Sequence, residues 1–567
     1  MTTTTPSSDI EVAAAAFPAG ADAATAAEYR RRGWWGDEVL LDHVRRHARE
    51  RPDAPAFVAD AGTLSWTGYR DAAARLSGVL RSLGLPEGTR VAVLLPDSAT
   101  VHVAFLAAEQ AGLVVVGIGA RAGDREIAHL VGRTGAVALV TEAHHRGRAA
   151  GDLAADLVAH HVMRHHVVVP RFEADPGGDI LVDGQVSDAA PDTEGPRTHP
   201  DDLFLVNSTS GTTGLPKCVL HNQNRWMYFH QRAVLSGGLD TDEVVLSLVP
   251  APFGFGLWTG HFTPTLLGAP TVVTERFDAE RALDLIERHR VTTLACVSTQ
   301  FVMMLNAPGL GDRDLSSLRV MFTGGEAVPY ERAVDFEART GATVLQFFGS
   351  NETGLLSGTT LDDTADHRLR TAGRVIDDMQ VRLYDGDRDV TGTGRGQPAG
   401  RGPAACLGYL GDPAANEQLL TPDGWMLMGD ICTLDADGYL TVVGRTSDFI
   451  IRGGKNISAP QVEDEVGTHP AVALAAAVAW PDPVFGERVC AYVELKADAA
   501  DAADSKLDLD ALTAHLAARG TSKELFPEVL VVLDHLPRSS GGKVAKGELR
   551  ADVARRATEA TQPNHPV

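Results

Sequence analysis

The chain has 567 residues, enough for more than one folding unit, and its hydrophobic (44%) and charged (22%) fractions exclude a disordered or fibrous protein. With 75 acidic residues against 51 basic ones, the formal net charge of -24 opposes nonspecific attraction to nucleic acid or anionic lipid. An anionic ligand must therefore meet local hydrogen-bond donors and cations.

The first 27 residues, rich in Thr, Ser, Ala and Pro, predict a mobile arm, and they lack the basic segment and apolar core of a signal peptide. No later stretch approaches the roughly 18 apolar residues of a membrane span. We expect a cytoplasmic protein that binds neither nucleic acid nor membrane. The cysteines form no CxxC pair, which favours small buried packing residues over a disulfide or zinc framework; they are Cys218, Cys296, Cys406, Cys432 and Cys490.

Apolar residues recur at helical spacing in two early segments, at positions 41, 44 and 48 and at positions 76, 79 and 83. Short runs rich in apolar residues, 91–95, 113–118 and 136–141, are separated by segments of helical length. This alternation is typical of βαβ units with a parallel sheet. The first two thirds of the chain therefore predict an α/β fold.

A segment of hydroxyl residues and glycines follows the apolar run 203–206 and ends at a lysine. Its glycines let backbone N–H groups approach an anion, its hydroxyls add donors, and the lysine adds a positive charge, so it is suited to phosphate. A Walker A loop is disfavoured because Pro216 precedes the lysine and Cys218 follows it. The segment reads Ser208-Thr209-Ser210-Gly211-Thr212-Thr213-Gly214-Leu215-Pro216-Lys217.

Further motifs follow in order: Gly324-Gly325-Glu326-Ala327-Val328-Pro329, Gln346-Phe347-Phe348-Gly349-Ser350-Asn351-Glu352, Gly424-Trp425-Met426-Leu427-Met428-Gly429-Asp430, Gly444-Arg445-Thr446-Ser447-Asp448, and Pro537-Arg538-Ser539-Ser540-Gly541-Gly542-Lys543. With these motifs the chain, from about residue 29 to residue 550, resembles the adenylate-forming superfamily of acyl-CoA synthetases, peptide-synthetase adenylation domains and luciferases. The resemblance implies a large domain of parallel-rich α/β layers with a distorted barrel, residues 28–446. It also implies a small mobile α+β C-terminal domain, residues 447–567.

The resemblance implies that the chain binds ATP. The loop 209–217 is expected to hold the β and γ phosphates. Gly324 and Gly325 are expected to pass one face of adenine while Phe348 covers the other, and Asp430 to accept hydrogen bonds from the ribose hydroxyls. The full ATP-binding set implied in this way is Thr209, Ser210, Gly211, Thr212, Thr213, Lys217, Gly324, Gly325, Glu326, Phe347, Phe348, Gly349, Asn351, Asp430 and Arg445.

Two residues carry the implied catalytic roles. Glu352 is expected to bind Mg²⁺, which prefers oxygen ligands and commonly bridges substrate phosphates. Lys543 is expected to hold the substrate carboxylate and the α-phosphate together, two anions that otherwise repel. A positioned charge of this kind contributes about 10² to 10³ in rate.

In the superfamily the C-terminal domain turns between two poses. The hinge is expected at Ser447, and the turn is expected to bring Arg452, Gly453 and Gly454 to the site, where the glycines leave room for the pantetheine arm of coenzyme A. Ser458, with Gln461 three residues later, predicts a capping box at the start of a helix in this domain.

The acid pocket implied by the motif positions consists of Phe229, Phe253, Gly254, Phe255, Trp258 and Gly325. This set is apolar and roomy, which favours an aromatic, alicyclic or polycyclic acid over an amino acid. The alternative is that these aromatic residues belong to the core. The segment Tyr29-Arg30-Arg31-Arg32-Gly33-Trp34-Trp35 is similar to the start of aryl-acid and alicyclic-acid ligases.

Three positions depart from the superfamily pattern: Phe253, where many relatives have histidine, and Asn351 and Met428, where threonine is usual. The sequence therefore predicts an acid-thiol ligase that joins a bulky apolar acid to coenzyme A through an acyl adenylate, with four alternatives. The enzyme could form only the thioester from a supplied adenylate, load a carrier protein, oxygenate the adenylate as luciferases do, or bind nucleotide without catalysis.

Overall fold

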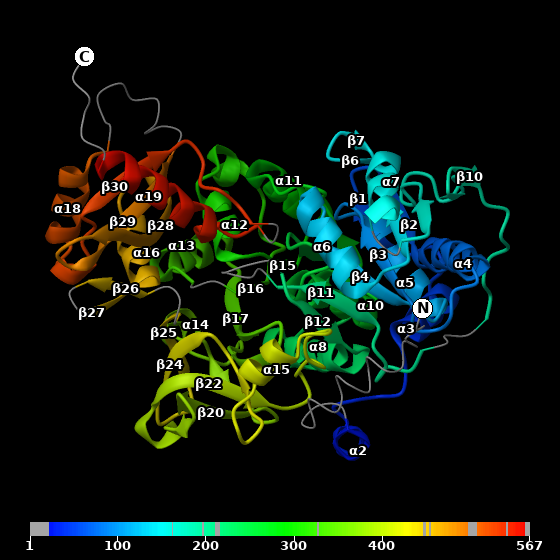
Figure 1. The fold of residues 1–567 in the computed structure, drawn as a ribbon, viewed down its shortest axis with the longest axis horizontal. Coiled ribbons are helices and arrows are strands. Elements are labelled where there is room, and N and C mark those ends of the chain that lie inside the picture. Colours follow the sequence, from blue (N-terminus) through cyan, green and yellow to red (C-terminus); the bar gives the residue numbers. More distant parts are fainter. Residues whose placement is uncertain are drawn as a thin grey trace.

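The computed structural model describes residues 22–160, 163–194, 198–209, 216–325, 328–445, 449–452, 455–496, 507–539 and 542–561. In these parts of the chain, two large mixed sheets and their helices form the larger body, and two smaller sheets lie towards the carboxyl end (Figure 1). The amino-terminal helix α2 (Ala23–Arg31) contains the last residues of the predicted arm, and Ala26 within it is buried.

An eight-stranded sheet contains the three strands predicted from the early apolar runs. Its order is β10-β9-β8-β5-β3-β4-β11-β12, and the pairs from β8 to β11 are parallel, which confirms the predicted α/β class. Its strands are β3 (Arg90–Leu94), β4 (Val114–Ile118), β5 (Ala138–Thr141), β8 (His165–Val168), β9 (Leu181–Val182), β10 (Gln185–Val186), β11 (Leu205–Ser208) and β12 (Cys218–His221).

A nine-stranded sheet has the order β19-β18-β17-β16-β15-β13-β14-β1-β2, with parallel pairing from β1 to β17. It brings the Gly324 and Phe347 motifs onto neighbouring strands, because β16 and β17 pair in register there. Its strands are β1 (Pro55–Ala59), β2 (Gly62–Ser65), β13 (Val245–Ser247), β14 (Thr271–Val272), β15 (Thr293–Ala295), β16 (Val320–Gly324), β17 (Thr343–Ser350), β18 (Gly354–Gly358) and β19 (Arg374–Val375).

The helices predicted from apolar spacing are present. Leu41, Val44 and Ala48 are buried on α3, and Leu76 and Val79 are buried on α4. The helices of the larger body are α3 (Leu40–Glu50), α4 (Trp66–Ser82), α5 (Ala99–Gln110), α6 (Asp124–Thr134), α7 (Ala150–His160), α8 (Gln223–Gly237), α9 (Gly254–Gly256), α10 (Thr263–Leu267), α11 (Ala279–His289), α12 (Ser298–Leu305), α13 (Tyr330–Thr340), α14 (Ala365–Arg370) and α15 (Pro413–Leu419), with a π-helical turn η1 (Leu257–Phe262), short 3-10 turns η2 (Pro308–Asp312) and η3 (Thr391–Thr393), and a small ribbon of β6 (His144–His145) and β7 (Arg148–Ala149).

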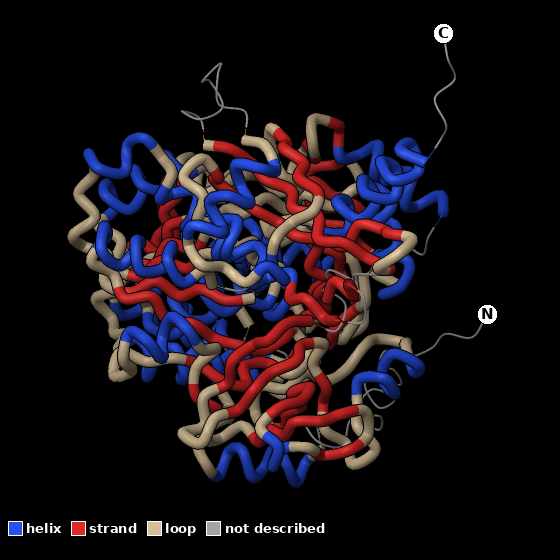
Figure 2. Tube along the Cα trace, turned by 90° about the vertical axis from the view of Figure 1, so that its left-hand side faces the viewer, coloured by secondary structure: helices blue, strands red, loops and turns tan. Residues whose placement is uncertain are grey.

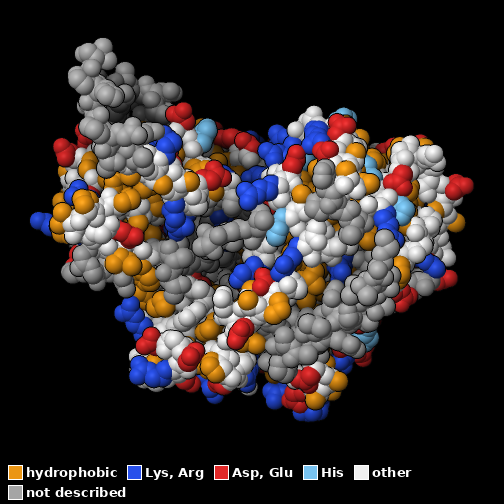
Figure 3. All heavy atoms as spheres, viewed as in Figure 1, with side chains coloured by type: hydrophobic (Ala, Val, Ile, Leu, Met, Phe, Trp, Pro, Cys, Tyr) orange, Lys and Arg blue, Asp and Glu red, His pale blue; other side chains and the backbone are white. Residues whose placement is uncertain are grey.

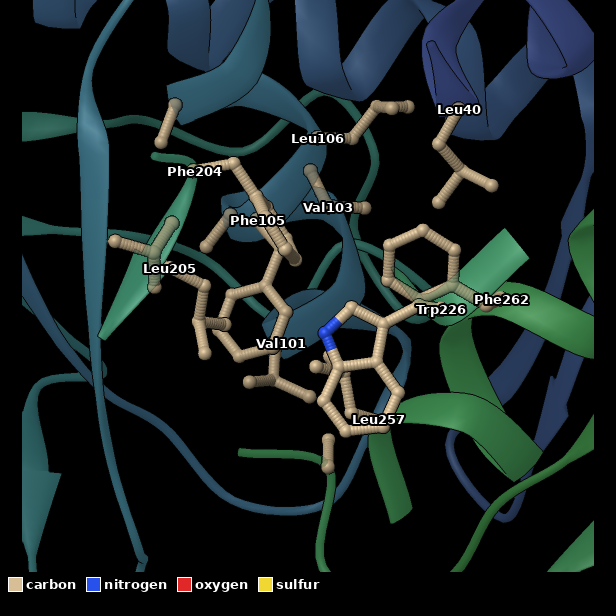
Figure 4. Close-up of a cluster of buried hydrophobic side chains, with 14 of the residues drawn as sticks. Leu40, Val101, Val103, Phe105, Leu106, Phe204, Leu205, Trp226, Leu257 and Phe262 are labelled. Carbon is tan, nitrogen blue, oxygen red and sulfur yellow. The ribbon is translucent and has the colours of Figure 1, made fainter. Parts of the chain in front are cut away.

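The main hydrophobic core lies where α5, β11, α8 and η1 meet (Figure 4). The rings of Phe204 and Phe262 meet edge to face at 5.7 Å, and Trp226 stacks on Phe262 at 6.4 Å. Aromatic pairs in these geometries stabilise a core by roughly 0.5–1.5 kcal/mol beyond their buried area. This core holds η1 and its preceding loop in place.

The six-stranded sheet corrects one expectation. Its strands pair antiparallel in the order β21-β20-β22-β24-β25, and in the described residues β21 does not return to β25, so the sheet is open and the expected distorted barrel is not closed. Figure 2 shows this strand-rich part below the helices of the larger body. Its strands are β20 (Gln380–Asp385), β21 (Arg388–Asp389), β22 (Arg395–Arg401), β23 (Met426–Leu427), β24 (Asp430–Leu434) and β25 (Leu440–Arg445).

The five-stranded sheet near the carboxyl end packs against α12, and a shared hydrophobic cluster joins the two parts. Phe301 of α12 and Tyr492 of the five-stranded sheet both belong to this cluster and are fully buried. The elements of this part are β26 (Phe449–Arg452), β27 (Lys455–Ser458), β28 (Val472–Asp482), β29 (Gly486–Leu495), β30 (Val529–Leu533), α16 (Ala459–Gly467), α18 (Leu509–Ala518), η4 (Lys523–Leu525) and α19 (Lys546–Thr561).

The predicted helix start at Ser458 is confirmed, but the predicted capping box is wrong. Ser458 is the residue before α16, and its side chain makes no capping hydrogen bond; its Oγ atom is buried without a partner. The reason is that Ser458 also pairs with Phe449 as the last residue of β27, which fixes its backbone from the strand side.

Among the described residues no helix is both long enough and apolar enough to cross a membrane. All five cysteines are buried, as predicted, and none of them forms a disulfide.

Candidate active site

The predicted phosphate loop connects two adjacent antiparallel strands. Ser208 at the end of β11 pairs with Cys218 at the start of β12, and the Thr209 N–H donates to the Lys217 carbonyl oxygen at 3.1 Å. The two ends of the loop are therefore held together. Its predicted phosphate donors between them lie outside the described residues, namely Ser210, Gly211, Thr212 and Thr213.

Lys217 and Glu352, two predicted phosphate-site residues, are joined by one aromatic side chain. The Lys217 Nζ atom lies 4.8 Å from the centre of the Tyr409 ring. The Tyr409 hydroxyl donates to Oε1 of Glu352 at 2.7 Å. The structure thus brings the lysine of the loop and the predicted metal ligand to the same place, although they are 135 positions apart in the sequence.

The predicted adenine wall consists of glycines in tight backbone contact. A Cβ atom on Gly324 would lie 2.7 Å from the Phe347 carbonyl oxygen, and one on Gly349 would overlap the Gly354 carbonyl oxygen. Only glycine permits these approaches. Phe348 is half-buried and packs against two hydrophobic clusters, whereas Glu326 lies outside the described residues.

Lys543 reaches this wall from the carboxyl-terminal part. Its Nζ atom donates to the Gly325 carbonyl oxygen at 2.7 Å. Lys and Arg side chains border the hollow between this part and the larger body (Figure 3). An acidic chain thereby presents local positive charge where an anionic ligand would enter, as its net charge requires.

Asp430 is buried at the start of β24 and pairs with Arg445 of β25 across the antiparallel ladder. The side chain of Arg445 lies outside the described part of the structure.

Met428, two residues before Asp430, is 3% exposed and packs into the main core, so its thioether faces other side chains.

Both parts of the chain match family models. Residues 44–410 match the model of the AMP-binding enzyme, and residues 461–543 match the AMP-binding enzyme C-terminal domain. The chain belongs to the AMP-binding enzyme family of adenylate-forming enzymes.

Two curated relatives cover nearly the whole chain. It is 31% identical over 537 residues to the medium-chain fatty-acid–CoA ligase of Escherichia coli (strain K12), covering 94% of both chains. It is also 31% identical to the 2-hydroxy-7-methoxy-5-methyl-1-naphthoate–CoA ligase of Streptomyces carzinostaticus, covering 96% of this chain and 99% of that one.

The crystal structure of the anthranilate CoA ligase AuaEII in complex with anthranoyl-AMP has the same fold. It superposes with a TM-score of 0.82 at 23% identity and covers 93% of this chain and 98% of that one. Together these matches confirm the predicted superfamily and the predicted class, an ATP-dependent acyl-CoA synthetase that acts through an acyl adenylate.

In this family member three residues of the predicted acid pocket, Phe229, Phe255 and Trp258, form one aromatic cluster with Phe347. Trp258 lies at its centre, stacked on Phe255 at 5.5 Å and on Phe229 at 6.4 Å, with the Phe347 ring edge to face at 5.6 Å. Trp258 and Phe229 are buried in the main core, whereas Phe253 and Phe255 are half-buried. Gly254 is confined, since a Cβ atom there would lie 3.0 Å from Oδ1 of Asn351.

The predicted thiol-site residues lie on the carboxyl-terminal part. Arg452, at the end of β26, is ion-paired with Glu528 at 2.5 Å and donates to the Glu524 carbonyl oxygen at 2.9 Å. Gly453, Gly454 and the predicted hinge Ser447 lie outside the described residues. The guanidinium is therefore held within its own domain while Lys543 contacts Gly325.

Sequence reasoning missed a buried polar network beneath Asn351. Asn351 and Asn207 exchange side-chain hydrogen bonds of 2.6 and 3.3 Å, and His221 contacts Oδ1 of Asn207 at 2.7 Å. Arg225, fully buried, donates to the Asn351 carbonyl oxygen at 3.0 Å and also contacts His221. Burial lowers the Arg225 pKa to about 10. The electrostatic effects of Cys406 and Glu352 raise this pKa and oppose the shift only in part.

A signal for this network exists in the sequence. His221 is the last residue of β12, and Arg225 lies four residues later in the first turn of α8, directly before the run Trp226-Met227-Tyr228-Phe229, where a charged side chain is unusual. Tyr409 carried no comparable signal, because a single tyrosine after the glycine at position 408 does not indicate its distant partners.

Proposed function

We propose that the enzyme joins a bulky apolar carboxylic acid to coenzyme A, with ATP activating the acid as an acyl adenylate. The observations that support the proposal are the contacts made by Lys217, Glu352 and Lys543. The first two meet through Tyr409, and the third contacts Gly325 at the glycine wall.

The residues fit ATP and Mg²⁺ by their chemistry. Glu352 offers a carboxylate with a second oxygen beyond the one bonded to Tyr409, and one or two carboxylates with substrate phosphates are the usual protein environment of Mg²⁺. Gly324 and Gly325 present backbone without side chains, which suits a flat base. When bound, Mg²⁺ would neutralise part of the phosphate charge.

In the proposed adenylation step, Lys543 lies between the acid carboxylate and the α-phosphate of ATP. Its positive charge offsets their repulsion as the carboxylate oxygen attacks phosphorus and pyrophosphate leaves. Lys217 and the loop 209–217 hold the departing phosphates, and Asp430 and Arg445 hold the ribose. Phe347, Phe348 and Gly349 line the base.

In the proposed thioester step, the C-terminal domain (447–567) turns about Ser447 relative to the larger domain (28–446). Arg452, Gly453 and Gly454 then approach the acyl adenylate, the thiol of coenzyme A attacks its carbonyl carbon, and AMP leaves. Turning breaks the Lys543 contact, so one lysine serves one half-reaction. We also propose a reducing, cytoplasmic setting, supported by five buried cysteines that form no disulfide.

The proposed acid is aromatic or alicyclic. The half-buried rings of Phe253 and Phe255 and the central Trp258 offer flat apolar surface, and apolar burial contributes about 25 cal/mol per Å². None of the predicted pocket residues carries a carboxylate that could pair with an α-amine.

A second candidate, formation of the thioester alone from a supplied adenylate, is favoured by two observations. The Asn351 side chain donates a hydrogen bond to Asn207, and Met428 packs in the core. Neither side chain carries the hydroxyl of the threonine that is usual at these two positions.

One experiment separates these functions. A panel of aromatic, alicyclic and aliphatic acids is incubated with ATP, Mg²⁺ and coenzyme A, and thioesters are detected by mass spectrometry, with synthetic acyl adenylates in parallel. We expect thioesters in both series and pyrophosphate exchange with the accepted acids. Product from adenylates alone supports the second candidate, and acyl transfer to a carrier protein without free coenzyme A ester supports carrier loading.

A further inference from the structure

The chain segment around Tyr409 runs between the phosphate loop and Glu352. Its backbone pairs with β12 directly after Lys217: the Leu410 N–H donates to the Cys218 carbonyl oxygen at 2.8 Å, and the Leu220 N–H donates to that of Gly408 at 2.8 Å. On the other side, the Cys406 N–H donates to the Glu352 carbonyl oxygen at 2.8 Å. The segment is thus fixed to both motifs by backbone hydrogen bonds.

The Tyr409 backbone is held from a third direction as well. Its N–H donates to Oδ1 of Asn416 at 2.8 Å, and its carbonyl oxygen accepts from Nδ2 of the same residue at 3.0 Å. The side chain is 6% exposed. A ring held in this way has little freedom to choose another direction, so its two contacts are set by the fold.

These two contacts are chemically different. The hydroxyl donates to Glu352 at 2.7 Å, and burial together with the negative charge of Glu352 raises the Tyr409 pKa well above its usual range, so the hydroxyl stays protonated as a donor. The ring face receives the Lys217 ammonium at 4.8 Å. The negative face of the ring attracts a cation, and the attraction grows when the pair is removed from water.

We propose that Tyr409 is a positioning residue for the phosphate end of the site, with its hydroxyl orienting the Glu352 carboxylate and its ring holding the Lys217 ammonium. The inference rests on the proposed function, since it takes Glu352 as the Mg²⁺ ligand and Lys217 as a phosphate ligand. One carboxylate oxygen bonded to Tyr409 leaves the other directed for the metal, as outer hydrogen bonds orient metal ligands elsewhere.

The two contacts can be separated by substitution. Tyr409→Phe removes the hydroxyl and keeps the ring, whereas Tyr409→Leu removes both. A matched control is Tyr492→Phe, because Tyr492 is also buried and its hydroxyl donates to Asp552 at 2.8 Å, within the carboxyl-terminal part. Thermal melts accompany each variant and measure general loss of stability.

The test is calorimetric titration of a nonhydrolysable ATP analogue into each protein, with Mg²⁺ and with EDTA. The dissociation constant in EDTA divided by the dissociation constant with Mg²⁺ measures how strongly the metal assists binding. For Tyr409→Phe we expect this ratio to fall about tenfold, the lower bound for loss of an outer partner of a metal ligand, with binding in EDTA unchanged. For Tyr409→Leu we expect binding in EDTA to weaken as well, by about fivefold.

Three outcomes overturn the inference. They are an unchanged ratio in Tyr409→Phe, which includes an equal loss with Mg²⁺ and with EDTA, a fall of the same size in Tyr492→Phe, and unchanged binding in EDTA for a folded Tyr409→Leu. Tyr409→Phe decides the hydroxyl role even if Tyr409→Leu does not fold. If the unmodified enzyme binds no analogue under either condition, the proposed function fails; if it binds and only the variant prediction fails, the role of Tyr409 alone is wrong.

Discussion

The Nζ atom of Lys543 donates to the carbonyl oxygen of Gly325 at 2.7 Å, although the two residues are 218 positions apart. The contact joins the last motif of the chain to the glycine wall. In the proposed mechanism it holds the C-terminal domain (447–567) in the pose for adenylation, so substitution at this contact separates the two half-reactions.

Lys543→Ala is expected to reduce acyl-adenylate formation by about 10² to 10³ while leaving the fold intact, because it removes a positioned charge at the periphery of a domain. Pyrophosphate exchange measures the loss, and thioester formation from synthetic adenylate should be retained. Lys523→Ala, at an exposed lysine of the same domain, is the control. Undiminished exchange in Lys543→Ala contradicts the proposed role.

Gly325→Ala is expected to slow adenylation more than thioester formation. Gly325 has φ +76°, and a Cβ atom would lie 2.6 Å from Lys543 Nζ, so the side chain displaces the lysine. Gly386→Ala is a matched control: Gly386 has φ +59° with open space around its Cβ position, which isolates backbone strain of about 1–2 kcal/mol. Equal rate losses in both variants would show that strain alone is responsible.

Trp258→Ala is expected to shift the accepted acids towards larger ones, because the ring at the centre of the aromatic cluster is removed. The same change should lower the free energy of unfolding by about 3–5 kcal/mol. Trp425→Ala removes an equally buried ring that packs against Tyr384 and Ala399 of the six-stranded sheet, and it should lower stability without altering selectivity. The acid panel and urea unfolding measure the two effects, and an unchanged acid profile would place Trp258 in the core only.

Glu109→Gln is expected to remove a pH dependence of stability. Burial raises the Glu109 pKa from 4.5 to about 8, with an opposing hydrogen bond from the Leu41 N–H at 3.1 Å. The folded protein therefore holds a proton that the unfolded chain releases between these values. Its contribution is fully present below about pH 4.5 and is lost as the pH rises towards about 8, by about 1 kcal/mol per pH unit.

Glutamine keeps the acceptor for Leu41 without the ionisation. Urea unfolding at about pH 5.5 and about pH 7.5 should show a smaller difference for the variant than for the unmodified protein. The same slope in both proteins would mean that Glu109 titrates normally.

The sequence predicted the features that depend on local pattern. Alternating strand and helix lengths predicted the parallel sheet of β3, β4 and β5, and the Ser/Thr/Gly loop follows β11, which contains the end of the apolar run 203–206. These follow from periodicity and from glycine and lysine chemistry within one segment.

Features that depend on distant partners were not predictable. The amide pair of Asn351 and Asn207 and the Tyr409 contacts join segments with no shared local pattern. The expected capping bond of Ser458 failed because strand pairing with Phe449 competes at the same residue. A closed barrel failed because the edge strand β21 has only two residues and ends the ladder.

The buried cysteines have a practical consequence for the enzymology. All five thiols are at most 2% exposed, and burial raises the pKa of Cys218 to about 11 and those of Cys406 and Cys490 to about 12. Since the thiolate is the reactive form, disulfide reagents should react with the native protein far more slowly than with free coenzyme A. Colorimetric titration of free thiol can therefore follow coenzyme A consumption continuously, and a sudden rise in protein-derived colour would signal unfolding during the assay.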